Sequence, residues 1–167
     1  MKHLVGVVLI CCLASATYAD LLAAWEVTGV TASTVPVFTN TYTAANIDSN
    51  QTYLTLGPGI TASTAANTFQ GSTWTATSYA DAVSSNDYIS WFIVAESGYQ
   101  FTVTNIAFNF VRSSTGASNM VVQSSYDTFS SDLFSSNSIG NTTFAPSISV
   151  SLTDTSDVEI RLYGWGA

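Results

Sequence analysis

The chain has 167 residues, of which 47% are hydrophobic, 13% aromatic and 8% charged, and its formal net charge is −8. This length fits one ordinary domain, and so apolar a composition excludes an intrinsically disordered protein. The negative charge argues against nucleic-acid binding, because neutralising phosphates requires clustered lysines and arginines.

Residues 1–19 have the pattern of a secretory signal peptide. A short basic start is followed by an apolar run at 4–13 and then by small residues up to Ala19. The run is shorter than the roughly 20 residues that a membrane-spanning helix needs. We expect cleavage after Ala19, with Ala16 as a second acceptable site; a buried N-terminal helix is the alternative. The prediction is therefore a secreted protein without a membrane anchor in this chain, with its domain at 20–167.

Removal of this leader limits the chemistry that the domain can perform. Both cysteines, the single histidine and the single lysine lie within it, so 20–167 holds eleven acids against two arginines, a formal charge of −9. Such a domain has no Ser-His-Asp triad, cysteine nucleophile, Schiff-base lysine, or histidine or cysteine ligand for zinc. Glycoside hydrolysis by paired carboxylates and calcium binding through oxygen ligands remain open.

The domain is predicted to be all-β. Serine and threonine dominate it, helix-forming residues are scarce, and short alternating segments recur between turn-forming clusters. We expect a single antiparallel β-sandwich, jelly-roll-like, with one helical turn beginning near Ser130 or Ser131. The predicted strands are 23–28, 35–42 (an edge strand, because of Pro36), 52–56, 68–74, 88–95, 100–104, 106–112, 120–124, 142–150 and 158–163.

A period of two assigns the faces of the clearest strands. Alternate apolar residues should point into the core, since successive side chains of a strand lie on opposite faces. The predicted core triplets are Ile89, Trp91 and Ile93; Ile106, Phe108 and Phe110; and Val158, Ile160 and Leu162.

Several short motifs, in their order and spacing, resemble a known family. Together with the leader they are WEVTG (25–29), NDYIS (86–90), SGY (97–99), RSSTG (112–116), SSYDTF (124–129) and RLYGWGA (161–167). In this combination the chain resembles the exported β-sandwich domains of bacterial PEP-CTERM sorting-domain proteins. The resemblance implies a jelly-roll-like sandwich, export, and association with the cell surface or exopolysaccharide matrix. Such proteins continue with a further strand and a sorting tail, so we expect either a fragment or a freely secreted member.

Aromatic side chains are the candidates for ligand binding. Trp91 alternates with isoleucines and is expected in the core, whereas Trp74, Tyr79 and Trp165 lie among small or polar residues and are candidate sugar-stacking groups. The predicted function is a non-catalytic protein of the cell surface or exopolysaccharide matrix with a structural or interaction role. A carbohydrate-binding module that takes extracellular polysaccharide is the alternative.

Acidic residues suggest two further functions. Asp81, Asn86 and Asp87 fall within seven residues and could supply oxygen ligands to a structural calcium ion, although Asp and Asn also stabilise turns by themselves. No other cofactor is expected. A glycosidase-like jelly-roll enzyme is the third and least favoured alternative. It would need two paired carboxylates, and the three glutamates, Glu26, Glu96 and Glu159, are far apart in sequence.

Overall fold

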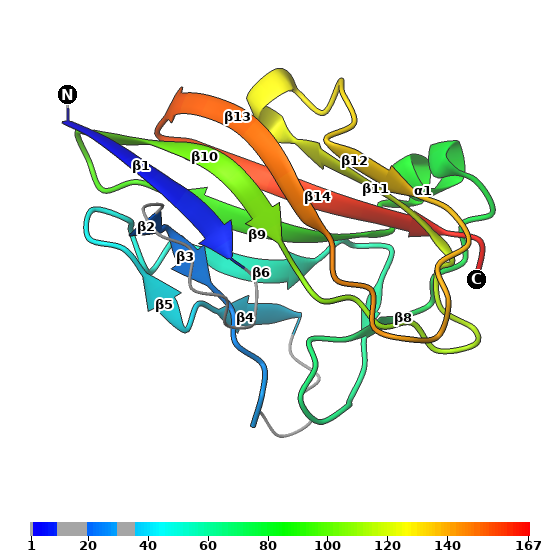
Figure 1. Cartoon of the computed structure of the whole chain (residues 1–167). Coiled ribbons are helices and arrows are strands. Elements are labelled where there is room, and N and C mark those ends of the chain that lie inside the picture. Colours follow the sequence, from blue (N-terminus) through cyan, green and yellow to red (C-terminus); the bar gives the residue numbers. More distant parts are fainter. Residues whose placement is uncertain (1, 10–19, 30–35) are drawn as a thin grey trace.

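A computed structural model of the chain describes residues 2–9, 20–29 and 36–167, and for 2–9 it describes the backbone only. Both predicted cleavage sites, at Ala16 and Ala19, lie outside the described residues. The described chain is mostly β-structure arranged in layered sheets (Figure 1). The all-β, sandwich-like fold predicted from the sequence is therefore confirmed.

The larger sheet of the described chain contains six strands. They are β4 (Val37–Thr39), β6 (Tyr53–Leu56), β9 (Tyr88–Val94), β11 (Asn119–Ser124), β12 (Phe134–Ser136) and β14 (Asp157–Trp165). Their spatial order is β12-β11-β14-β9-β6-β4, and all neighbours are antiparallel. Strand β4 lies at an edge, as Pro36 predicts, because proline has no N–H to donate to a sheet.

The second sheet of the described chain has four strands. They are β1 (Lys2–Leu9), β2 (Asp20–Leu21), β10 (Tyr99–Ala107) and β13 (Ser147–Thr155), in the order β13-β10-β1-β2. Strands β10 and β13 are antiparallel, whereas β1 runs parallel to both β10 and β2. In Figure 1, β1, β10 and β13 lie in front of β9 and β14. Residues 2–9, the first part of the predicted leader, thus form a strand here and not the helix considered as an alternative.

Shorter elements complete the described structure. They are the pair β3 (Ala23–Ala24) and β5 (Tyr42–Thr43), the pair β7 (Thr61–Ala62) and β8 (Gly71–Ser72), the helix α1 (Tyr79–Ser85) and the 3₁₀ turn η1 (Ser125–Asp127). The helical turn predicted near Ser130 is wrong, because η1 precedes it. The sequence analysis missed α1, although Ser78 caps it by accepting a hydrogen bond from the backbone N–H of Asp81 (3.2 Å).

One hydrophobic core joins the two large sheets. It combines Phe101, Val103 and Ile106 of β10 and Ile148 and Leu152 of β13 with inward-facing residues of the six-stranded sheet. Those residues include Trp91, Ile93, Val158, Ile160 and Leu162, all at most 5% exposed. The predicted faces of β9 and β14 are therefore confirmed. Each large side chain buried in this way contributes about 1.5–3 kcal/mol to folding.

Strand β10 differs from its prediction. Two strands separated at Asn105 were expected, but β10 is continuous from Tyr99 to Ala107. Its buried positions change from odd to even numbers between Val103 and Ile106, where its register with both β1 and β13 shifts. Such an irregularity brings both residues to the core face, which a strict period of two cannot do.

Candidate binding cavity

A cavity of about 780 Å³ opens among the described residues, between the six-stranded sheet and the loops beside it. This volume lies within the range of roughly 300–1,000 Å³ that is typical of small-molecule sites. Its walls come from five parts of the chain: 25–28, 54, 63–74, 89–91 and 108–117, with Leu162 added by β14. Figure 1 shows the strands β6, β9 and β14 and the loop around β8 that bring these segments together.

The floor of the cavity, defined as its buried lining residues, is aromatic and aliphatic. It comprises Trp25, Trp91, Phe108, Leu54, Ala117 and Leu162. The rings of Trp91 and Phe108 pack with centroids 5.6 Å apart and planes inclined by 34°. Trp25 is only 1% exposed, so this tryptophan belongs to the core and is not a surface platform.

The rim, defined as the exposed lining residues, is largely polar. Its amide and hydroxyl groups belong to Thr28, Asn67, Thr68, Gln70, Thr73, Asn109, Ser113 and Thr115, and the exposed Val111 adds one apolar side chain. Between floor and rim lie three half-buried aromatic residues: Phe69, Trp74 and Phe110. An apolar interior with a few polar groups at its mouth is the common composition of a site for a small organic ligand.

Trp74 is held firmly in the cavity wall. Its indole Nε1 donates a hydrogen bond to the carbonyl oxygen of Gly71 (3.0 Å). Its ring lies directly over Gly164 of β14, where an added Cβ would come within 2.7 Å of the ring atom Cζ3. The absence of a side chain at Gly164 therefore creates the space that the indole occupies.

Three buried polar atoms of lining residues have no hydrogen-bond partner among the described residues. They are Nε1 of Trp25, Nε1 of Trp91 and Oγ of Ser63. Leaving such a group unpaired costs about 1–3 kcal/mol, so well-packed proteins rarely tolerate it without a reason. A bound molecule or water that satisfied these groups would recover part of that free energy.

The other two predicted aromatic site residues lie elsewhere. Tyr79 of α1 and Trp165 of β14 pack on each other with ring centroids 5.8 Å apart, and Tyr163 lies beside Tyr79 at 6.0 Å. Both are half-buried, and neither is among the residues that line the cavity. The reason is the strand period: Leu162 and Gly164 face the cavity, so Tyr163 and Trp165 face the opposite side of the sheet.

The predicted calcium ligands each have a role at the ends of α1. Asp81 accepts a hydrogen bond from the Thr77 hydroxyl (2.6 Å), and that bond and the one from Ser78 hold the pKa of its carboxyl below the ordinary value. Asn86 ends the helix in the left-handed conformation (φ 60°). Asp87 is fully buried, and its Oδ2 accepts a hydrogen bond from the backbone N–H of Ala76 (3.2 Å).

No group of three or more His, Cys, Asp or Glu residues in the described chain could hold a metal ion. The capping and turn geometry around α1 accounts for Asp81 and Asn86 without one. The calcium site stays a prediction from the sequence.

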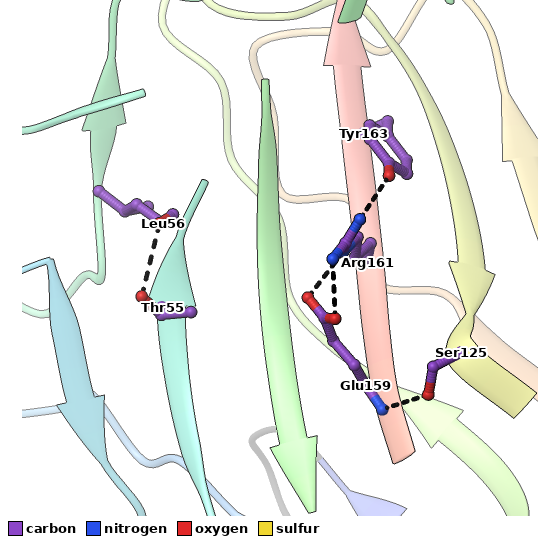
Figure 2. Close-up of polar contacts among 6 residues, drawn as sticks. All are labelled: Thr55, Leu56, Ser125, Glu159, Arg161 and Tyr163. Carbon is purple, nitrogen blue, oxygen red and sulfur yellow. Dashed lines mark hydrogen bonds and ion pairs between the residues drawn. The ribbon is translucent and has the colours of Figure 1, made fainter. Parts of the chain in front are cut away.

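A second polar cluster lies on the outer face of β14. Figure 2 shows Arg161 between Glu159 and Tyr163, with hydrogen bonds of 2.7 Å and 2.9 Å to the two carboxylate oxygens and 3.2 Å to the phenol oxygen. The guanidinium also stacks over the rings of Tyr88 (4.5 Å) and Phe129 (4.1 Å). Burial alone would lower the pKa of Arg161, but Glu159 and Tyr163 raise it overall, so the side chain stays charged.

The cavity offers no acid–base pair. No aspartate or glutamate is among the described residues that line it. Of the three glutamates, Glu159 is engaged by Arg161, and Glu26 accepts a hydrogen bond from the backbone N–H of Thr28 (2.8 Å). Retaining and inverting glycosidases both require two carboxyl groups flanking the bound sugar. The described residues that line this cavity do not supply such a pair.

Comparisons with known proteins add no assignment. No family model, no curated protein and no solved structure matched the chain. No helix within the described residues is long and apolar enough to cross a membrane.

Sequence reasoning found one of the cavity's aromatic side chains as a candidate, Trp74, and missed the site itself. Phe69 was assigned only to a strand, and Phe110 was predicted to point into the core, against which it packs half-buried. A single signal was available for Phe69, which is an isolated aromatic residue within a run of small and polar residues.

Proposed function

We propose that this chain is an exported, non-catalytic protein of the cell surface or extracellular matrix that binds polysaccharide in the cavity formed by its six-stranded sheet and the loops beside it. The observation that carries the proposal is the composition of the cavity, in which an aromatic floor lies below a rim of amides and hydroxyls. A sugar ring presents apolar C–H faces that pack on aromatic rings and hydroxyls that pair with such polar groups.

The size of the cavity supports this ligand class. About 780 Å³ has room for a short stretch of a glycan chain, and the half-enclosed shape lets the rest of the chain extend into solvent. Trp74 is the best-placed stacking group, because its hydrogen bond to Gly71 and its contact with Gly164 fix the ring before any ligand binds. Rigid aromatic contacts add affinity at a low cost in conformational entropy.

The leader and the Ser/Thr-rich composition support the proposed location. A protein that functions among polysaccharides must first be exported, and residues 1–19 have the pattern of a secretory signal. The resemblance to exported β-sandwich domains is consistent with the same location and rests on the sequence motifs alone.

Polysaccharide affinity electrophoresis and a glycan array test the proposal. We expect the secreted protein to bind at least one extracellular polysaccharide and Trp74→Ala to lose at least tenfold in affinity. Trp165→Ala is the matched control, because it removes an indole from the opposite face of β14 and should bind normally. Circular dichroism checks that both variants fold. Absence of binding across the array, or equal loss in the two variants, would refute the assignment.

A further inference from the structure

The two arginines outside the leader have different electrostatic environments. On the outer face of β14, Glu159 neutralises the charge of Arg161 through a bidentate ion pair. In the cavity wall, Arg112 is held by three hydrogen bonds that all end on backbone carbonyl oxygens. Carbonyl groups are neutral, so these bonds position the guanidinium without cancelling its charge.

The three bonds also orient Arg112. Its Nε donates to Ser113 O (3.0 Å), Nη1 to Ile139 O (3.2 Å) and Nη2 to Ser114 O (2.9 Å). A guanidinium has five N–H groups, so one hydrogen on each terminal nitrogen lies outside these bonds. A fork of two parallel N–H groups is the geometry that matches a carboxylate.

The charge balance of the cavity follows from its lining. Among the described residues that line the cavity, Arg112 has the one charged side chain, and none of the others is an aspartate or glutamate. Electrostatic attraction is stronger in a half-enclosed apolar cavity than in open water, because the local dielectric is lower. An anionic group on a ligand would therefore find a favourable partner at this wall.

We infer that the cavity prefers an acidic saccharide, a uronate-bearing glycan segment whose carboxylate pairs with Arg112. This inference rests on the proposed function and specifies its ligand class. The chain as a whole is acidic, with a net charge of −8, and repels a long polyanion at a distance. The preference is thus local to the cavity, and a short oligosaccharide at about 0.15 M salt, where the Debye length is roughly 8 Å, is the appropriate probe.

Isothermal titration of the secreted protein with a short oligogalacturonide and with its uncharged galactose counterpart tests the inference. We expect the acidic ligand to bind at least tenfold more tightly. Arg112→Gln should remove this difference while the neutral ligand still binds, and Arg112→Lys should retain part of it, because lysine keeps the charge but not the fork. Arg161→Gln is the matched control and should leave the preference unchanged.

The outcomes separate the two proposals. Equal affinity of the wild-type protein for both ligands, or a preference that survives in Arg112→Gln, overturns the acidic-saccharide inference and leaves polysaccharide binding standing. Absence of binding by either ligand and across the glycan array overturns both. If Arg112→Gln fails to fold by circular dichroism, the wild-type comparison and Arg112→Lys decide the matter: a lysine variant without any acidic preference, or a wild type without one, refutes the inference.

Discussion

Gly164→Ala should destabilise the protein, although it adds a single methyl group. The new Cβ would lie 2.7 Å from Cζ3 of Trp74 and 2.8 Å from Cβ of Ala117. Ordinary contacts begin near 3.4 Å, so a wall of the cavity must move by about 0.7 Å. Ala117 cannot rotate away from the new methyl group, and the hydrogen bond to Gly71 restrains Trp74. Overpacking of this kind costs about 1–3 kcal/mol.

Urea denaturation monitored by tryptophan fluorescence measures this cost. With m near 2 kcal/mol/M, the midpoint should fall by about 0.5–1.5 M at an unchanged slope. Gly140→Ala is the matched control, because its added Cβ would meet only the Thr142 hydroxyl, at 3.9 Å, and should change stability by less than about 0.5 kcal/mol. Combining Gly164→Ala with Trp74→Ala should recover part of the loss. A Gly164→Ala midpoint equal to the wild-type value would refute the packing described for this wall.

Arg161→Lys should lower the melting temperature nearly as much as Arg161→Gln. Lysine lacks the two-pronged guanidinium that binds both carboxylate oxygens of Glu159 and the planar group that stacks on the Tyr88 ring. A lysine variant that melts at the wild-type temperature would contradict this. Burial chiefly raises the pKa values of Tyr79 and Tyr88 above 10. Their neutral forms therefore stabilise the fold below that pH, and this contribution is lost as the pH rises through the raised pKa values. Ultraviolet titration should show two tyrosines that ionise later than the others, and uniform ionisation near pH 10 would contradict this. Intact-mass analysis of the secreted protein should give a product that begins at Asp20, and retention of the first nineteen residues would contradict the export signal.

The strands that the sequence predicted best are those with one fully buried face. In β14, Val158, Ile160 and Leu162 alternate with charged residues, so the period of two identifies both the element and its inner face. In β9, Ile89, Trp91 and Ile93 share one face, although Phe92 and Val94 on the other face are apolar as well. Strands of two or three residues, such as β7 and β12, are too short to show a period. The helix α1 was missed because Tyr79–Ser85 contains few strong helix formers; its capping pair, Ser78 and Asp81, was the available signal.

The cavity could not be derived from the sequence in the same way. Its aromatic residues come from segments as far apart as Trp25 and Phe110, and only the folded sheets bring them together. The sequence could place Trp91 in the core and propose Trp74 for binding. It could not show that Trp74 faces the cavity while Trp165 faces away, because that depends on how β14 is oriented against its neighbours.

The position of β1 within the predicted leader would make cleavage of that leader a change in the smaller sheet. This strand lies between β10 and β2, so its backbone supplies hydrogen-bonding neighbours to both. Cleavage by signal peptidase after Ala19 would therefore remove a strand from the interior of this sheet and not a terminal segment outside it. If the leader is cleaved, β10 would become a nine-residue edge strand in place of the two-residue edge strand β2, and its unpaired backbone groups could then pair with a strand of another chain.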